Sequence, residues 1–200
     1  MSNADKNVFI KDYFGNIKSV LDNIPIEKVV SVISLLEESY QDKRQIFIAG
    51  NGGSASTASH MANDFMMGVA KKRDRGFKAI SLSDSNSIIT AVANDNSYEE
   101  IFSAQLVELG NKDDILIVFS GSGNSPNIVR VVEMAKKIKI KTIAFLGRNG
   151  GDVGKIADLC IVVPAEDYGP IEDIHLIFDH LITTYFLKQP LNEATRVKNP

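Results

Sequence analysis

The chain has 200 residues, of which 44% are hydrophobic, and its formal net charge at pH 7 is −3. This length suffices for one well-buried α/β domain and is too short for two domains of ordinary size. Charges of both signs are spread along the chain, and the basic stretch at residues 71–73 is short, so we expect no nucleic acid partner. The sequence has no apolar stretch of membrane-spanning length and no signal-peptide pattern, and we therefore expect a cytoplasmic protein without a membrane partner.

The predicted elements alternate between helices and short apolar strands. Two helices over about residues 9–40, broken at 23–25, come first. Strands are predicted near 45–49, 77–82, 115–119, 142–146 and 159–163, and helices near 54–67, 86–94, 98–109, 125–138 and 171–187. This alternation predicts an α/β fold, a flavodoxin-like three-layer arrangement with a doubly wound, five-stranded parallel sheet, in a single domain over 1–188 with a polar tail over 189–200. The one cysteine, Cys160, lies in an apolar run and is predicted to be a core thiol.

Two loops rich in glycine and serine directly follow the first and third predicted strands. In parallel sheets, ligands bind beyond the carboxyl ends of the strands, where the N–H groups of the following helix are unpaired. Glycines allow close approach, serine hydroxyls add donors, and the helix N-terminus contributes partial positive charge, which together suit a phosphate group. The candidate phosphate-binding residues are Asn51, Gly52, Gly53 and Ser54 in the first loop and Ser120, Gly121, Ser122 and Ser125 in the second.

Two helix ends carry further candidate residues. Ser125 is expected to cap the helix after the second loop, and Pro126 takes the first helical position, where its missing N–H costs nothing. The helix start is therefore fixed beside the serines of the loop. Asn94 and Asp95 end another predicted helix and could contact a ligand hydroxyl, although this pair is also ordinary at helix ends and turns.

His60 and Asp64 lie four residues apart on the helix that follows the first loop, so both project from one face and could bind one metal ion. An ordinary surface pair is the competing interpretation. Glu172, His175 and His180, with Asp173 and Asp179 beside them, interrupt the apolar last helix. They lie either on a solvent-facing stripe or, for Glu172 and His180, in a metal or catalytic centre. Glu172 and His180 are eight residues apart, which corresponds to a rise of about 12 Å along a helix. A centre that contains both would therefore require a later helix start or contributions from two subunits.

The last predicted helix carries apolar residues around most of its circumference. Such a helix is expected to be buried on nearly all sides, either in the core or at a subunit interface. Together with the two N-terminal helices, this pattern favours a symmetric homo-oligomer.

Taken together, these motifs resemble the sugar isomerase (SIS) domain family and, within it, the phosphoheptose isomerases, over about residues 5–187. The matching segments are residues 50–55, 59–64, 94–95, 120–125 and 171–175, together with His180. The resemblance implies a cytoplasmic homotetramer with active sites at subunit boundaries that converts sedoheptulose 7-phosphate to D-glycero-D-manno-heptose 7-phosphate. It also implies bound zinc, although another divalent metal ion would suit the same residues.

By position, the resemblance implies that the two loops hold the substrate and its phosphate and that Asn94 and Asp95 contact the sugar. The implied catalytic residues are Asp64, Glu172 and His180, and the implied metal ligands are His60, Asp64, Glu172 and His180. Ketose–aldose interconversion moves a proton between adjacent carbons through an enediol, which requires a base together with an acid or a metal ion. Either carboxylate, Glu172 or Asp64, could be the base, with His180 as its acid partner.

The chain departs from the family pattern at three positions. Better-known members carry glutamate at the position of Asp64, glutamine at that of Glu172 and threonine at that of Gly121. Asp64 reaches less far by one methylene and Glu172 adds a titratable carboxylate, so the identity of the base and the charge at the metal stay open. The same departures leave room for a related heptose or octose phosphate as substrate.

Two other functions are compatible with parts of the sequence. Gly50, Gly52 and Ala55 fit the spacing of a dinucleotide-binding loop, but the acidic residue expected about 20 positions later is not obvious, Asp84 being the nearest candidate. A second phosphate loop also has no role in such a protein. The other alternative is a non-catalytic module of the same fold that senses a phosphosugar or binds a protein, for which an acid at position 64 and a histidine at position 180 have no evident use.

Overall fold

The computed structural model describes residues 2–188, and the polar tail predicted over 189–200 lies outside the described residues. Five strands form one sheet, with the order β2-β1-β3-β4-β5 and parallel pairing throughout. Their bounds are β1 Gln45–Gly50, β2 Lys78–Ser81, β3 Ile115–Ser120, β4 Lys141–Gly147 and β5 Leu159–Val163. The predicted five-stranded parallel sheet is confirmed. Its strand order reverses between β1 and β3, the place where sheets of this type bind ligands.

Helices connect the strands and account for most of the remaining described residues. Their bounds are α1 Asn3–Asp22, α2 Ile26–Asp42, α3 Gly53–Asn63, α4 Asn86–Asp95, α5 Ser103–Leu109, α6 Pro126–Lys137, α7 Val153–Ile156 and α8 Tyr168–Lys188. The helix predicted over 98–109 is broken into a 3-10 turn at Tyr98–Glu100 followed by α5. After α3 the chain continues as a π-helix over Asp64–Gly68, where an uninterrupted α-helix was expected.

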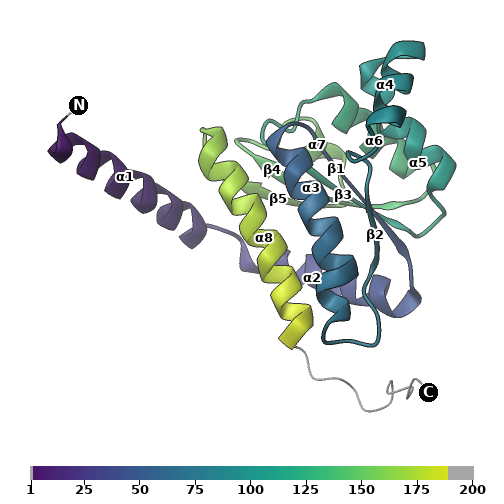
Figure 1. Ribbon diagram of the computed structural model, residues 1–200, viewed down its shortest axis with the longest axis horizontal. Coiled ribbons are helices and arrows are strands. Elements are labelled where there is room, and N and C mark those ends of the chain that lie inside the picture. Colours follow the sequence, from purple (N-terminus) through teal and green to yellow (C-terminus); the bar gives the residue numbers. More distant parts are fainter. Residues whose placement is uncertain (1, 189–200) are drawn as a thin grey trace.

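The sheet separates two hydrophobic cores, because successive residues of a strand point to opposite faces. In β1, Ile46 and Ile48 pack with α2, α3 and α8, whereas Phe47 and Ala49 pack with the layer that contains α5, α6 and α7. The chain thus has the expected three layers, with α3 and α8 lying side by side over one face of the sheet (Figure 1). Cys160 is half-buried against the second core, and burial raises the pKa of its thiol, as expected of a structural cysteine.

Helix α1 extends away from the body of the molecule (Figure 1). Val20 is its one buried residue, while Phe9 and Phe14 are 62% and 66% exposed. The helix is tied to the start of α8 by the Tyr13 hydroxyl, which donates a hydrogen bond of 2.6 Å to the Asp173 carboxylate. Most of the apolar surface of α1 is therefore left uncovered within one chain.

Helix α8 is buried on the side that faces the sheet and exposed on the other. Ile174, Phe178 and Ile182 belong to the core, whereas Ile177 and Leu181 are 36% and 43% exposed. The expected burial on nearly all sides is thus not reached within one chain. Neither α8 nor any other helix within residues 2–188 has the length and apolar character needed to cross a membrane.

Asp114 offers a direct test of how the sheet is held together at its amino-terminal edge. Its buried carboxylate accepts backbone N–H groups from Gln45 at 2.9 Å and from Asn111 at 2.8 Å. We predict that Asp114→Ala lowers the free energy of unfolding by about 2–4 kcal/mol, because two backbone donors lose a charged acceptor. Urea unfolding measures this difference. The exposed Glu108→Ala on α5 serves as control and should change stability by no more than about 0.5 kcal/mol; an equal loss in both variants would contradict the assigned role.

Candidate active site

The two glycine-serine loops meet at the carboxyl edge of the sheet because their strands are neighbours. Gly50 at the end of β1 is paired with Phe119 of β3. Between the loops lies a cleft of about 250 Å³. Its lining consists of Asn51, Gly52, Gly53, Ser54, Phe119, Ser120, Gly121, Ser122, Ser125, Tyr168 and Glu172. All eight residues that the sequence indicated for phosphate binding therefore line one cleft.

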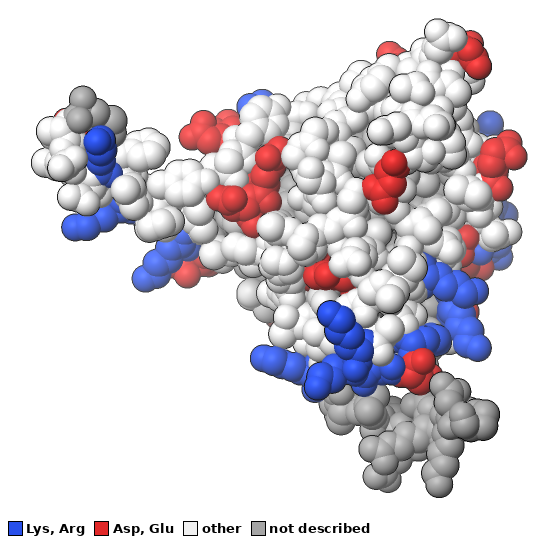
Figure 2. All heavy atoms as spheres, viewed as in Figure 1, with Lys and Arg blue, Asp and Glu red and all other residues white. Residues whose placement is uncertain are grey.

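No lysine or arginine is among the residues that line the cleft. Basic side chains on the body of the molecule gather instead where α8 ends, at the opposite end of that helix from the cleft (Figure 2). The N-termini of α3 and α6 directly follow the two loops and supply unpaired N–H groups with partial positive charge. An anion in the cleft would therefore be held by neutral donors and helix ends.

The serines of the second loop are oriented by the loop's own backbone. The Ser120 hydroxyl accepts the N–H of Gly123 at 3.0 Å, and the Ser122 hydroxyl accepts that of Asn124 at 3.1 Å. Each hydroxyl hydrogen thereby stays available to a ligand. Ser125 occupies the predicted N-cap position of α6 but makes no capping hydrogen bond through its side chain, so the expected side-chain cap is wrong. Ser125 itself lines the cleft.

Asn51 is held in place by a reciprocal amide pair with Asn127. The Asn51 amide donates to Asn127 at 2.8 Å, and the Asn127 amide donates back at 2.9 Å. Asn127 is only 2% exposed and lies at the second position of α6. The sequence did not indicate Asn127, because an asparagine near a helix start is ordinary and its partner is far away along the chain.

Glu172 enters the cleft from the first turns of α8 and lies against Gly53 at the start of α3. A Cβ atom at position 53 would overlap the Glu172 carboxylate, so a larger residue there would displace this side chain from the start of α3. The carboxylate thus lies beside the positive end of a helix, where negative charge is favoured. Among the residues that line the cleft, Glu172 is the one that carries a carboxyl group.

Gly121 leaves room for the ring of Tyr168, a cleft residue that the sequence did not indicate. A Cβ atom at position 121 would lie 2.7 Å from that ring. The guanidinium of Arg148 lies on the ring as well, 4.8 Å from its centre. The Tyr168 ring therefore occupies the space next to the backbone that a side chain at position 121 would need.

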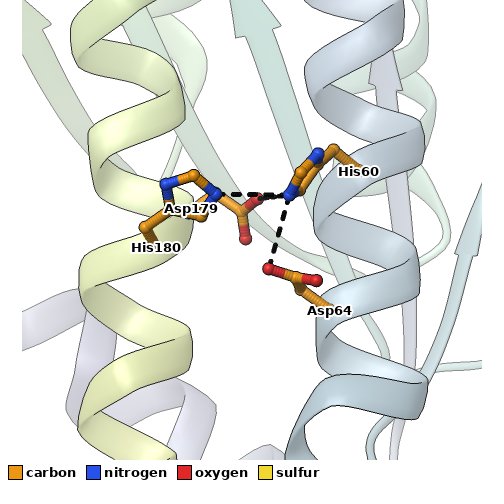
Figure 3. Close-up of side chains that lie close together, drawn as sticks. All are labelled: His60, Asp64, Asp179 and His180. Carbon is orange, nitrogen blue, oxygen red and sulfur yellow. Dashed lines mark hydrogen bonds and ion pairs between the residues drawn. The ribbon is translucent and has the colours of Figure 1, made fainter.

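A second group of polar side chains lies further along the contact between α3 and α8, where His60, Asp64, Asp179 and His180 point toward one another (Figure 3). The Nε2 atom of His60 lies 3.2 Å from Nε2 of His180, 3.5 Å from Oδ2 of Asp64 and 3.8 Å from Oδ2 of Asp179. One ligand atom from each of the four residues falls within 4.8 Å of all the others. This cluster could hold a metal ion.

The two carboxylates of this cluster differ in environment. Asp64 begins the π-helix after α3, a local widening that recurs at functional sites, and its side chain is 24% exposed. Asp179 is fully buried, and burial followed by the nearby Asp64 charge raises the pKa of its carboxyl to about 7, against the lowering effects of His180 and Thr183. The raised pKa means that the ionised form of Asp179 is destabilised in its surroundings.

Several residues implied as site residues lie apart from this cluster. Glu172 is outside it, and α8 runs without interruption from Tyr168, so a later helix start cannot bring Glu172 and His180 together. Asn94 and Asp95 are exposed at the end of α4 and do not line the cleft. The solvent-facing interpretation also fails for part of α8, since His175 is fully buried against Phe119 and burial lowers its pKa to about 4.

Comparison with known proteins agrees with this arrangement. Residues 12–147 match the model of the SIS domain. A Helicobacter pylori protein named phosphoheptose isomerase is 41% identical over 156 residues, covering 78% of this chain and 81% of that protein, and one from Clostridium acetobutylicum is 34% identical over 88% and 89%. The solved structure of a phosphoheptose isomerase from Francisella tularensis superposes with a TM-score of 0.83 at 26% identity, covering 94% of this chain and 100% of that one. The chain therefore belongs to the SIS domain family and, within it, to the phosphoheptose isomerases.

Proposed function

We propose that the protein is an aldose–ketose isomerase that converts sedoheptulose 7-phosphate to D-glycero-D-manno-heptose 7-phosphate. The observation that carries this proposal is the cleft itself, which combines eight phosphate-binding candidates with one carboxylate, Glu172. Phosphate recognition and proton transfer are the two requirements of a phosphosugar isomerase. The names of the relatives at 34–41% identity support the same reaction.

In this proposal the second loop holds the phosphate and Glu172 moves the proton. The Glu172 carboxylate takes a proton from C1 of the ketose, which leaves an enediol, and returns it to C2 to give the aldose. The proton of the O1 hydroxyl leaves as the C1 carbonyl forms, while the oxygen on C2 becomes a hydroxyl. Glu172 is the stronger candidate for the base because Asp64 lies outside the cleft lining and within the His60 cluster.

We further propose that His60, Asp64 and His180 hold a zinc ion, which brings Asp64 and His180 into the reaction as metal ligands. Zinc bonds of about 2.0–2.2 Å would place tetrahedral ligand atoms about 3.3–3.6 Å apart. The distances from His60 to His180 and to Asp64, 3.2 and 3.5 Å, are close to this spacing. Two histidines with a carboxylate are also a donor set that zinc accepts. Zinc bound there supplies Lewis acidity toward a carbonyl or hydroxyl oxygen. Glu172 is then not a ligand within its own chain.

Incubation of the purified, metal-analysed protein with sedoheptulose 7-phosphate tests the proposed reaction. NMR should detect an aldose heptose phosphate, and exchange of the transferred hydrogen with deuterated solvent would indicate the enediol. Absence of turnover with and without added zinc overturns the proposal. Thermal stabilisation by the compound in that case would indicate a related sugar substrate or a phosphosugar sensor.

Glu172→Gln tests the assignment of the base. We predict a fall in kcat of about 10²–10⁴-fold, because the amide cannot accept the proton, while binding of the phosphate ester is largely retained. The NMR assay gives kcat, and isothermal titration with the substrate gives affinity. The exposed Glu133→Gln on α6 is the matched control and should leave both unchanged. Full activity of Glu172→Gln would remove this residue from the mechanism.

Ser122→Ala tests the phosphate-binding role of the second loop. A hydrogen bond to a charged group contributes about 1.5–3 kcal/mol, so we predict an increase in KM of about 10-fold or more with a smaller change in kcat. Ser56→Ala is the control, since Ser56 is exposed on α3 and lies outside the cleft lining. An unchanged KM for Ser122→Ala would argue against this loop as the phosphate site.

We also propose that the chain assembles into a homo-oligomer, a tetramer by resemblance, with active sites completed at subunit boundaries. The support is apolar surface that one chain leaves uncovered. On α1 this surface consists of Val8, Phe9, Ile10 and Phe14, which are 48–66% exposed. On α8 it consists of Ile177 and Leu181. Burying exposed apolar side chains between subunits is a strong driving force for association.

Size-exclusion chromatography with light scattering tests the assembly. We predict a mass of about four times the 21.9 kDa of the chain, and dissociation to smaller species in the double variant Phe9→Ser/Phe14→Ser. Lys11→Ser, an exposed change on the same helix, should leave the assembly intact. A monomeric wild-type protein would contradict the proposal.

A further inference from the structure

Asp179 has an unusual position among the polar residues of the chain. It is fully buried, yet Oδ2 of its carboxylate has no hydrogen-bond partner within the described residues. The other oxygen, Oδ1, accepts a long bond of 3.4 Å from the Thr183 hydroxyl. Leaving a buried carboxylate oxygen without a partner is costly, and native proteins generally provide one.

The unpartnered oxygen points into the cluster formed with His60, Asp64 and His180 (Figure 3). It lies 3.8 Å from Nε2 of His60, a distance beyond a hydrogen bond and close to the spacing of two ligands on one metal ion. Thr183 holds the other oxygen one turn further along α8, which orients the carboxylate toward α3. The arrangement is that of a metal ligand with a supporting hydrogen bond.

We propose that Asp179 is the fourth ligand of the metal ion held by His60, Asp64 and His180, so that all four ligands would come from one chain. This inference rests on the metal site in the proposed function. It also gives Glu172 and Asp179 different tasks, since Glu172 lies in the cleft about two helical turns before the cluster. The metal site then carries two histidines and two carboxylates, all from α3, the π-helix and α8.

A purely structural role for Asp179 and a role as metal ligand predict opposite effects of its replacement on the stability of the metal-free protein. If the carboxylate stabilised the fold through His60, its removal would lower the stability of the apo form. As a ligand without its ion, the carboxylate is instead a buried charge that lacks sufficient partners, so a neutral replacement should leave the apo form equally stable or more stable.

Zinc binding to the full-length apo protein, without any sugar, tests the proposal. Affinity is measured by competition with a chromophoric chelator for wild type, Asp179→Asn and Glu172→Gln, and cobalt(II) absorption reports the ligand geometry. We expect Asp179→Asn to weaken zinc binding by at least about 100-fold and to alter the cobalt spectrum, because loss of a direct ligand exceeds the effect of losing a supporting residue. Glu172→Gln should keep wild-type affinity and spectrum, and the exposed Asp167→Asn is the control.

Thermal unfolding of the apo proteins provides the second readout. Apo Asp179→Asn is expected to melt at or above the wild-type temperature, with the zinc-induced increase in melting temperature largely lost. Asp179→Ser is the second variant should Asp179→Asn not fold, and failure of both to fold would overturn the proposal because it would show a structural role. Wild-type zinc affinity in Asp179→Asn, or an equal loss in Glu172→Gln, would also overturn it.

The outcome is separable from the test of the isomerase. If wild type binds zinc through Asp179 but does not turn over sedoheptulose 7-phosphate, the proposed reaction fails and the ligand assignment stands. If wild type turns over the sugar but binds no zinc, the ligand assignment fails while the isomerase stands.

Discussion

The packing of α8 against α3 is the contact on which both functional regions depend. Ala58 and Met61 of α3 share one core with Ile174 and Phe178 of α8, and the many short side chains of α3 let the two helices approach closely. At one end of this contact the Glu172 carboxylate reaches the start of α3. Further along, the histidines and aspartates of the two helices face one another. A single helix pair thus fixes the distance between the cleft and the cluster of His60, Asp64, Asp179 and His180, and loosening this contact would disturb both.

Most of the fold follows from local pattern. The five strands are short apolar runs followed by glycine, serine or polar residues, so their positions and parallel arrangement could be predicted. The features that escaped prediction have weak local signals. Helix α7 has only four residues, too few for a periodicity, and the break before α5 places Ile101 and Phe102 in the core, which an unbroken helix pattern also allows. Likewise, the π-helix at Asp64 depends on packing that residue spacing does not encode.

The candidate site likewise contains residues that local sequence pattern indicates and residues that it does not. The loops around Asn51 and Ser122 were predictable because glycine, serine and a following helix start are contiguous in the sequence. Asp179 was not, since a charged residue in an apolar helix is usually solvent-exposed, and its burial is decided by α3 from across the helix contact. The eight-residue spacing of Glu172 and His180 did indicate correctly that one chain could not bring both to a single ion.

The absence of basic side chains from the lining of the cleft bears on the energetics of the proposed reaction. An isomerisation leaves the phosphate untouched, so ketose, intermediate and aldose present the same anion to Ser120, Ser122 and the helix ends. Binding that is equal in all three states lowers KM without lowering the barrier. In the proposed reaction, the second loop therefore serves as an anchor for the substrate in both directions. The groups at the other end of the sugar must supply all the selectivity for the transition state, and the sugars alone set the equilibrium.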